Sequence, residues 1–342
     1  MYSYAAYPKV VCEDIVRLRR ILEKAQLPPR RTDDNLLVGT WNLRNFGKLH
    51  PEWTENEDSP KRNLRALAYI AEIVRRFDVV AIQEIKRETT ALRVLVDEFL
   101  GSNWGVVVSD VAAGDKGNEE RLGYLYDRRR VTPSGLAGEI VLPPLEGLEP
   151  AEQFDRTPYV VGFRAGTDRF ALLTVHIRYG GGPADRRPEI LRLAAYTARE
   201  IRDRARFEGA EEMNLIVLGD FNIEARRAQD PLYEAFISSG LTVPPPLRDV
   251  QTNYAQAAKH YDQIAWFMGD LTLLDRGAAG VIDYRGTVYK ELTGRQVTDR
   301  VSDHLPLWVE FVTDRSSEAI ARTLGVDLGA PDPFAGIPDW RA

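Results

Sequence analysis

Polar side chains that could bind a cation or a phosphate stand at the ends of several apolar runs in the sequence. The clearest case is LIVLGDFN, in which four apolar residues lead into Gly219, Asp220, Phe221 and Asn222. A short, β-branched apolar run predicts a strand buried on both faces, and alternation along the chain puts Asp220 and Asn222 on one side of it. Taken alone, this stretch is more typical of a polar turn that ends a core strand.

Other apolar runs end or begin in the same way, and together they favour a functional site. The set consists of Asn42, Glu84, His176, Asp220, Asn222, Asp262, Asp303 and His304. Such residues could line one rim of a pair of sheets. Mg²⁺ needs only one or two carboxylates beside water and phosphate oxygens. Amides and imidazolium groups donate hydrogen bonds to phosphate, and a carboxylate beside a histidine fixes its tautomer. The set therefore predicts metal-assisted attack of water on a phosphate ester.

Strands and helices must bring these distant residues together. Apolar runs predict strands at residues 36–42, 78–84, 105–109, 121–126, 159–164, 170–176, 215–219, 261–267 and after 304, with another within 131–150. Helical periodicity and capping signals predict helices at 10–26, from Ser59-Pro60 to about 77, and at 90–100, 188–207, 231–239 and 317–324. A hairpin turn is expected at Gly166-Thr167, and residues 270–300 look irregular, with short strand-like pieces. Hairpins mixed with helical crossovers favour an α/β (α+β) fold, a four-layer sandwich of two mixed β-sheets packed face to face with helices outside.

Composition limits the class of protein. Of the 342 residues, 44% are hydrophobic and 28% are charged, as in globular proteins, and no apolar run approaches the roughly 20 residues of a membrane span. The net charge of −6 argues against binding nucleic acid by bulk charge, but it allows a local basic rim. Cys12 is the only cysteine, which excludes an intrachain disulfide and a cysteine-metal site and makes the cytoplasm the default location. We expect an N-terminal helical extension at 1–34, a catalytic domain at 35–313 and a C-terminal tail at 314–342.

A series of short motifs resembles one family. In chain order these are WNLRNFG, AIQE, RLGYLY, a strand ending in His176, LGDFN, YDQI and SDHLP. This order and spacing resemble the endonuclease/exonuclease/phosphatase superfamily over about residues 36–312, with the deoxyribonuclease I branch as the nearest match. The resemblance implies the same four-layer fold and a metal-dependent phosphoesterase activity.

The resemblance also implies roles for individual residues of this sequence. Glu84 would be the main metal ligand with Asn42 beside it, and Asp303 would contribute to the same cluster or to a second metal position. The expected cation is Mg²⁺, with Mn²⁺ or Ca²⁺ able to substitute or assist. Asp220 would orient or deprotonate the attacking water, and Asn222 would hold the phosphate.

Two histidines complete the implied catalytic set. His304 would bond the phosphoryl oxygen or transfer a proton, held by Asp262. His176 would be the second histidine, and Glu120 resembles the carboxylate that pairs with it in the deoxyribonuclease I branch. A Glu–His pair of this kind favours the nuclease branch over the abasic-site and inositol-phosphatase branches.

Three further residues have a plain alternative beside their implied role. Arg44 and Arg156 match positions of phosphate-contacting arginines, with ordinary surface charges as an equal alternative. Glu189 would be a supporting hydrogen-bond partner, or simply a favourable acid in the first turn of a helix.

The leading hypothesis is a metal-dependent endonuclease that hydrolyses DNA phosphodiester bonds, with DNA a more expected substrate than RNA. One alternative is a phosphatase or a phospholipid or sugar phosphodiesterase of the same superfamily. The motif HYDQIAW lacks the tryptophan, cysteine and arginine expected near this position in the inositol-phosphate branch. Another alternative is a binding module with a dead site, which predicts loss of a metal or base residue. Loops at 48–58, 110–119 and 179–187 should set substrate choice, and the terminal extensions could bind a protein partner.

Overall fold

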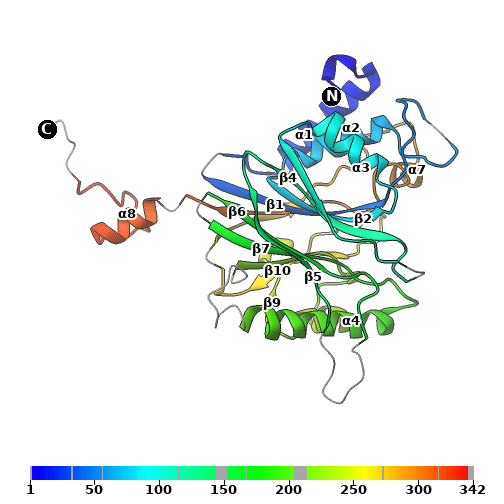
Figure 1. Cartoon of the computed structure of the whole chain (residues 1–342). Coiled ribbons are helices and arrows are strands. Elements are labelled where there is room, and N and C mark those ends of the chain that lie inside the picture. Colours follow the sequence, from blue (N-terminus) through cyan, green and yellow to red (C-terminus); the bar gives the residue numbers. More distant parts are fainter. Residues whose placement is uncertain are drawn as a thin grey trace.

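Apolar strands assemble into two six-stranded sheets in the computed structural model (Figure 1). The structure describes residues 2–31, 34–55, 57–113, 116–142, 152–166, 168–203, 214–271, 273–314 and 316–337. The first sheet has the strand order β11-β12-β1-β2-β4-β3, and the second has the order β5-β6-β7-β8-β10-β9. The strands of the first sheet are β1 (Asn35–Phe46), β2 (Val79–Lys86), β3 (Trp104–Val108), β4 (Glu120–Asp127), β11 (Leu274–Val281) and β12 (Leu307–Val312). Those of the second sheet are β5 (Thr132–Glu139), β6 (Tyr159–Ala165), β7 (Asp168–His176), β8 (Leu215–Asp220), β9 (Leu241–Thr242) and β10 (Asp262–Phe267).

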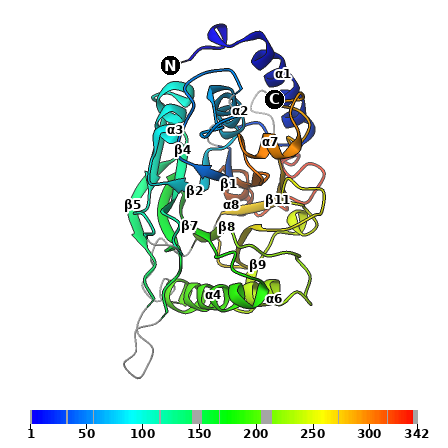
Figure 2. The same cartoon turned by 90° about the vertical axis from the view of Figure 1, so that its right-hand side faces the viewer.

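Each sheet contains one parallel pair of strands. β1 and β2 run parallel in the first sheet, β7 and β8 run parallel in the second, and the other neighbouring strands are antiparallel. Parallel neighbours need a crossover connection, and the helices α2 (Leu64–Val74) and α4 (Pro183–Tyr196) lie in these two connections. Figure 2 shows α2 and α4 on opposite outer faces of the sheet pair. The predicted sandwich of two mixed sheets with helices outside is therefore confirmed.

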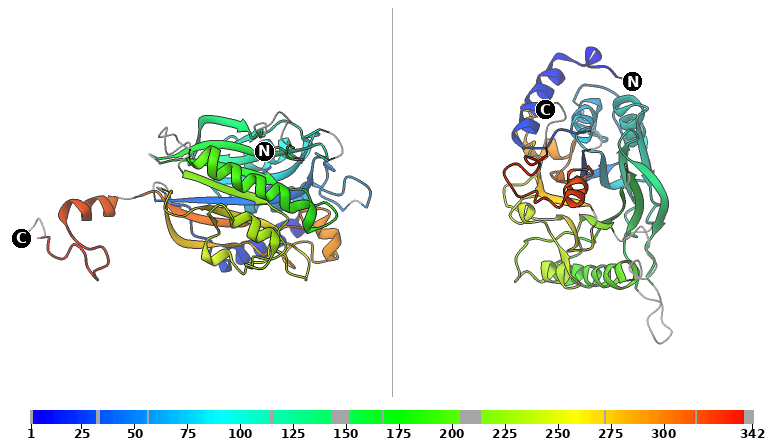
Figure 3. Two further views of the ribbon diagram at one scale, coloured as in Figure 1. Left: turned by 90° about the horizontal axis from the view of Figure 1, so that it is seen from below. Right: turned by 90° about the vertical axis from the view of Figure 1, so that its left-hand side faces the viewer.

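Apart from α8 (Ser316–Leu324), which follows the last strand, the remaining helices of the described residues cover the same two faces or lie in connections. They are η1 (Tyr4–Ala6), α1 (Lys9–Lys24), α3 (Thr90–Val94), η2 (Leu95–Leu100), η3 (Thr197–Asp203), α6 (Pro231–Ile237), η5 (Pro245–Leu247) and α7 (Gly294–Thr298). Figure 3 shows α8 projecting away from the sandwich. No helix within the described ranges is long and apolar enough to cross a membrane.

Alternation along β1 divides the apolar interior into two cores. Leu36 and Val38 face the second sheet and belong to one apolar cluster, which continues through that sheet to α4 and α6 on its outer side. Leu37 points the other way, into the core between the first sheet and the helices α1 and α2. Polar residues at the ends of such strands are therefore attached to a backbone that is packed against apolar side chains on both faces of the sheet.

Helix α1 is anchored by a buried carboxylate. Asp14 is 0% exposed and accepts hydrogen bonds from the side chains of Arg65 and Tyr69 and from the backbone N–H of Tyr289. The apolar side of α1 contributes Val11 and other residues to the second core. The N-terminal helix thus packs as an integral part of the first sheet's helical layer (Figure 2).

Two helices begin at residues other than those predicted. α2 begins at Leu64 rather than at Ser59-Pro60, because the Asn63 side chain caps it by accepting a backbone N–H. α4 begins at Pro183 rather than at Pro188, so that Pro188 lies inside the helix. Both prolines suit early helical positions, and the sequence does not distinguish which of them begins the helix. The last predicted residues of this helix, 204–207, lie outside the described residues.

Other predicted segments need smaller corrections. The stretch 270–300, expected to be irregular with short strand-like pieces, contains the strand β11 and also the helix α7, which was not expected. The β11 sequence LDRGAAGV is rich in glycine and charge, which hid the full length of this eight-residue strand. Thr167 of the predicted hairpin turn lies outside the described residues, as do residues 143–150 after β5.

Candidate active site

The register of the second sheet places three of the predicted site residues side by side. His176 on β7 pairs with Asp220 on β8, and Asp220 pairs with Asp262 on β10. A Cβ atom at Gly219 would lie 2.3 Å from the carbonyl oxygen of Val175, so this glycine permits the close approach of β7 and β8. Side chains at paired positions share one face, and the strand ends therefore present an imidazole and two carboxylates together.

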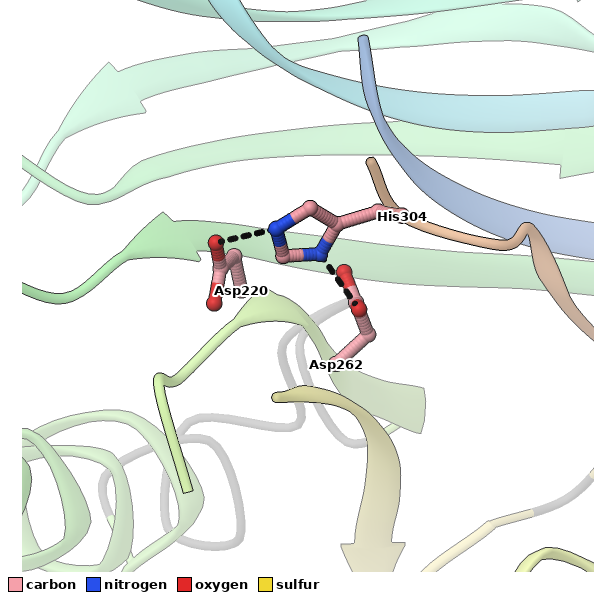
Figure 4. A group of neighbouring side chains, drawn as sticks. All are labelled: Asp220, Asp262 and His304. Atoms are coloured by element: carbon pink, nitrogen blue, oxygen red, sulfur yellow. Dashed lines mark hydrogen bonds and ion pairs between the residues drawn. The ribbon is translucent and has the colours of Figure 1, made fainter. Parts of the chain in front are cut away.

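His304 reaches the same carboxylates from the first sheet. It lies just before β12, and its Nδ1 is 2.8 Å from Oδ2 of Asp262 (Figure 4). Its Nε2 is 3.7 Å from Oδ2 of Asp220. His304 is 7% exposed as a whole residue, while Asp220 and Asp262 are 1% and 0% exposed. The predicted support of His304 by Asp262 is thus present in the structure.

The second imidazole approaches the same oxygen from another direction. Nε2 of His176 lies 3.5 Å from Oδ2 of Asp220, and its Nδ1 lies 2.9 Å from Oε2 of Glu120. Glu120, at the start of β4, also forms ion pairs with Lys86 and Arg156. Two imidazoles therefore converge on one carboxylate oxygen, and each is backed by a second carboxylate.

Burial and charge together fix the protonation of this cluster. Burial raises the pKa of a carboxyl group, but the imidazoles of His304 and His176 hold the pKa of Asp220 below its usual value. Burial raises the pKa of Asp262. Burial would lower the pKa of His304, but the carboxylates of Asp262 and Asp220 raise it well above its usual value. Despite burial, the neighbouring His176 holds the pKa of Glu120 well below its usual range. At neutral pH, His304 is therefore an imidazolium beside an ionised Asp220.

Asn42 joins this cluster to Glu84. Nδ2 of Asn42 donates to Oδ2 of Asp220 and to Oε1 of Glu84, both at 3.0 Å. Glu84 has a φ of +61° where the β2 register shifts, and its Oε2 accepts the backbone N–H of Asn45 at 2.7 Å. Non-glycine residues with positive φ are uncommon and cluster at functional sites.

Two groups of donors could hold a divalent cation. Each oxygen of Glu84 accepts one N–H and keeps a free lone pair, so this carboxylate can still bind a metal ion. Within the described part of the chain, one cluster of three ligand atoms within 4.8 Å combines Asp220, Asp262 and His304. In that cluster Oδ1 of Asp262 is buried without a hydrogen-bond partner. Oxygen-rich sets of this kind fit a hard cation.

The other implied ligands and phosphate contacts lie around this centre. Nη1 of Arg44 donates to Thr298 Oγ1 at 2.9 Å, and its guanidinium lies 3.3 Å from Asp299 and 3.6 Å from Asp303. The Asp303 side chain is 44% exposed. Arg44 and Asp303 are therefore accessible from solvent and paired with each other.

Asn222 and Arg156 are engaged with neighbouring groups. The backbone N–H of Asn222 donates to Oδ1 of Asp220 at 2.9 Å, and its Nδ2 donates to the Ile177 carbonyl at 2.8 Å. Arg156 is bound to Glu120, with only 12% of its side chain exposed. In this state Arg156 orients the carboxylate that backs His176.

Glu189 supports the backbone near the site from inside helix α4. It is 0% exposed, and its carboxylate accepts the backbone N–H groups of Asp155 at 3.0 Å and Arg178 at 2.9 Å. Because α4 begins at Pro183, Glu189 does not lie in the first helical turn. Its contacts agree with the supporting role rather than with the helix-end alternative.

Three positioning residues were not predicted from the sequence. Ser302 Oγ donates to the Asn42 carbonyl and accepts the backbone N–H of His304 at 3.0 Å. The buried Arg226 donates to the carbonyl of Asp262. The buried Arg62 binds a set of backbone carbonyls on both sides of the site, those of Leu43, Arg44, Asn45, Arg300 and Val301. Burial lowers the pKa of Arg62 to about 10. No local pattern marks these residues, because their roles depend on chain segments that are distant in sequence.

Two hollows lie beside the candidate catalytic cluster of His176, Asp220, Asp262 and His304, and Arg44 lines both. The larger hollow, of about 1050 Å³, has six cationic side chains in its wall against three acidic ones. The cationic residues are Arg44, Lys48, Lys61, Arg62, Lys86 and Arg87, and the acidic residues are Glu88, Glu119 and Asp299. We call this hollow the basic groove. The other, of about 610 Å³, includes His304, Asp303 and two tyrosines. An anionic chain could therefore pass the cluster with basic surface next to it, although the net charge is −6.

A buried cluster of carboxylates and imidazoles at the rim of two stacked mixed sheets defines a hydrolytic enzyme of the nuclease and phosphatase class. The chain belongs to the Endonuclease/Exonuclease/phosphatase family, which matches residues 39–304. The motifs that suggested this superfamily lie within the matched range, except that SDHLP continues two residues beyond its end, so the predicted family is confirmed.

Individual relatives support the same assignment. A protein named deoxyribonuclease from Thioalkalivibrio sp. (strain K90mix) is 29% identical over 299 residues, covering 84% of this chain and 73% of the relative. The fold is similar to that of an endonuclease/exonuclease/phosphatase family protein from Bacteroides thetaiotaomicron, with a TM-score of 0.56, 19% identity, and coverage of 82% and 96% of the two chains. It is also similar to a mannosyl-6-phosphatase from the same organism, with a TM-score of 0.53, 19% identity, and coverage of 81% and 99%.

Proposed function

We propose that this protein is a Mg²⁺-dependent endonuclease that hydrolyses DNA phosphodiester bonds by in-line attack of water. One observation carries the proposal: Nε2 atoms of His176 and His304 lie 3.5 and 3.7 Å from the same oxygen of Asp220. Glu120 and Asp262 approach the opposite ring nitrogens. A buried base between two oriented imidazoles supplies proton acceptance and proton donation at one point, as hydrolysis of a phosphate ester requires.

The proposed roles follow from the charges of these groups. Asp220 accepts a proton from the attacking water as its oxygen bonds to phosphorus. The His304 imidazolium donates a hydrogen bond to a phosphoryl oxygen, and His176 is placed to protonate the oxygen that leaves when the P–O bond breaks. Asn222 and Arg44 hold phosphate oxygens. No covalent intermediate is needed.

We place the metal ion at Glu84 and Asn42. Asp303, which pairs with Arg44, would be a further ligand. The other candidate cluster includes His304, whose imidazolium already balances two carboxylates there. A cation at that cluster would have to displace this proton, so Glu84 is the better candidate. Mg²⁺ bound there would neutralise charge on the phosphate in the transition state, and Mn²⁺ or Ca²⁺ could substitute or assist.

DNA is the proposed substrate because the 29% identical relative is named a deoxyribonuclease. The basic groove beside the catalytic cluster suits a phosphate backbone. We also propose that the enzyme acts in the cytoplasm, as expected for a chain with a single cysteine. A protein partner at the terminal extensions remains part of the hypothesis.

Plasmid cleavage tests the proposal directly. Supercoiled plasmid is incubated with the protein and Mg²⁺, with and without EDTA, and nicked and linear forms are measured. We expect nicking with Mg²⁺ only, and Asp220→Ala, His176→Ala and His304→Ala should each lower turnover at least about 100-fold while circular dichroism stays unchanged. The exposed Arg322→Gln on α8 serves as the control variant. Failure to cut any nucleic acid, together with hydrolysis of sugar or lipid phosphates, would establish the phosphatase alternative instead. Absence of both activities and of Mn²⁺ binding would indicate a dead binding module.

A further inference from the structure

The smaller of the two hollows has the size and position of a substrate pocket near the proposed base, Asp220. It measures about 610 Å³, within the roughly 300–1,000 Å³ range of small-ligand sites. We call it the Tyr254 pocket. Its wall contains His304, Asp303 and Arg44 from the candidate site, and Tyr254, Tyr261, Arg285 and Arg295 from outside it. A ligand in this pocket would therefore touch His304 of the catalytic cluster and also residues that have no role in the proposed hydrolysis.

Backbone pairing fixes this wall to the catalytic histidine. The N–H of Tyr254 donates to the carbonyl of Asp303 at 2.7 Å, and the N–H of Leu305 donates to the carbonyl of Thr252 at 2.6 Å. Between these bonds, Asn253 pairs with His304 in an isolated antiparallel bridge. The backbone of Tyr254 is thus held at a fixed place relative to that of His304.

Side chains within the loop stiffen it further. Asn253 accepts the N–H of Lys259 at 2.8 Å and donates to the Ala257 carbonyl at 2.9 Å. Nε2 of Gln251 donates to the carbonyls of Asn253 and Ala255. A loop cross-linked in this way presents a preformed surface, which lowers the entropy cost of binding.

Aromatic rings and unequal charge give the pocket its chemistry. The Tyr254 ring is half-buried, with its centroid 5.7 Å from that of Tyr284. The Tyr261 ring lies 5.7 Å from the His304 ring. Arg285 is held by Asp283, whereas Arg295 on α7 is exposed and forms no ion pair with any residue in the described ranges. Aromatic surface with a free guanidinium beside it suits a flat ring that carries an anionic group.

We propose that the Tyr254 pocket binds the nucleobase of the nucleotide next to the scissile phosphate, with the base stacked on Tyr254 and its neighbouring phosphate contacted by Arg295. This inference rests on the proposed nuclease function. The phosphate at Arg44 would join this nucleotide to the strand in the basic groove, because Arg44 lines both hollows. Every base has a π-face, so stacking of this kind binds without strong sequence preference.

A consequence concerns the form of DNA that is cut. A base in a concave pocket cannot be paired within a duplex, so it must be single-stranded or must leave the helix before cleavage. Unpairing has a cost in a matched duplex and a lower one at a mismatch. The proposed pocket therefore favours single-stranded DNA, or duplex DNA with an unpaired nucleotide at the cut.

Oligonucleotides with single missing bases test the inference. A labelled single strand carries a tetrahydrofuran abasic unit at successive positions, and cleavage at each bond is measured with wild-type enzyme and Mg²⁺. We expect one position, directly beside the cut, at which loss of the base slows cleavage at least about five-fold, the lower end of the range for one stacked base. Tyr254→Ala should remove this difference between intact and abasic strands, Tyr254→Phe should retain it, and the distant Arg322→Gln should behave as wild type.

The outcomes separate this inference from the function on which it rests. Cleavage of DNA with the same rate for intact and abasic strands at all positions overturns the base pocket and leaves the nuclease proposal intact. A position-specific effect that persists in Tyr254→Ala also overturns it. A protein that cuts no nucleic acid overturns the nuclease proposal and this inference together. If Tyr254→Ala does not fold, Arg295→Gln provides a second test. The phosphate contact is contradicted if this variant binds the intact strand as tightly as wild type and keeps the wild-type difference in rate between intact and abasic strands.

Discussion

Replacing Asp220 with asparagine should lower the pKa of His304 as well as the rate of hydrolysis. Nε2 of His304 lies 3.7 Å from Oδ2 of Asp220, and both side chains are buried. With an effective dielectric constant of about 20, Coulomb's law gives roughly 4 kcal/mol for two unit charges at this separation, which is an upper limit for the effect of this pair. Removing an anion disfavours the protonated imidazole, so the pKa must fall. Asp262, at 2.8 Å, still holds it above the value of an isolated buried imidazole.

Histidine NMR in metal-free buffer measures this change independently of activity. The chain has only four histidines, so His304→Gln assigns the resonance by its disappearance. We expect the His304 imidazole to titrate at lower pH in Asp220→Asn than in wild type. Single-turnover cleavage should fall at least about 100-fold, because the proposed base is lost. The exposed Asp332→Asn in the C-terminal segment provides a control that removes the same charge elsewhere. A folded Asp220→Asn protein whose His304 titrates as in wild type would refute the electrostatic argument.

Three other changes have definite expected outcomes. Glu120 has a pKa below its usual value in the folded protein, so it stabilises the protein above about pH 4.5, and this stability is lost as the pH falls toward the folded pKa. In urea titrations at different pH, Glu120→Gln should therefore reduce the acid-side slope of the unfolding free energy by up to about 1.4 kcal/mol per pH unit. The exposed Glu119→Gln serves as the control and should keep the wild-type slope. Lys48→Gln should reduce the slope of log binding constant against log salt by about one for duplex DNA, and Arg322→Gln should leave it unchanged in anisotropy measurements. Ser302→Ala removes two hydrogen bonds that position the catalytic segment and should slow cleavage roughly ten-fold at a stability cost of about 1–3 kcal/mol; an unchanged rate would contradict this positioning role.

The convergence of the rim could be predicted because it follows from strand periodicity. Asp220 and His176 end apolar runs on parallel strands, and Asp262 begins a run on an antiparallel one, so all three reach the same edge of the sheet. The family motifs gave the pairing of His304 with Asp262 and of His176 with Glu120, and the distances agree with both pairs. Their catalytic roles stay proposals until the variants are measured.

The supporting contacts could not be predicted, because they depend on register between distant segments. Ser302 binds the Asn42 carbonyl across 260 positions of sequence. Arg62 was expected inside a helix, but its guanidinium binds backbone carbonyls across the site, and the helix begins only after it. The Tyr254 pocket likewise depends on how one loop pairs with the segment before β12, which no local pattern records.

The buried carboxylate of Asp14 has a practical consequence for anyone who shortens this protein. A fragment starting at β1 would lose the partner of Arg65 and Tyr69 and would expose the apolar surface now covered by Val11 and Leu18. Such a fragment would be prone to aggregation whatever the condition of its catalytic rim. Expression vectors and fusion junctions should therefore retain α1. Inactivity of a fragment without α1 would not test the roles proposed for the site residues.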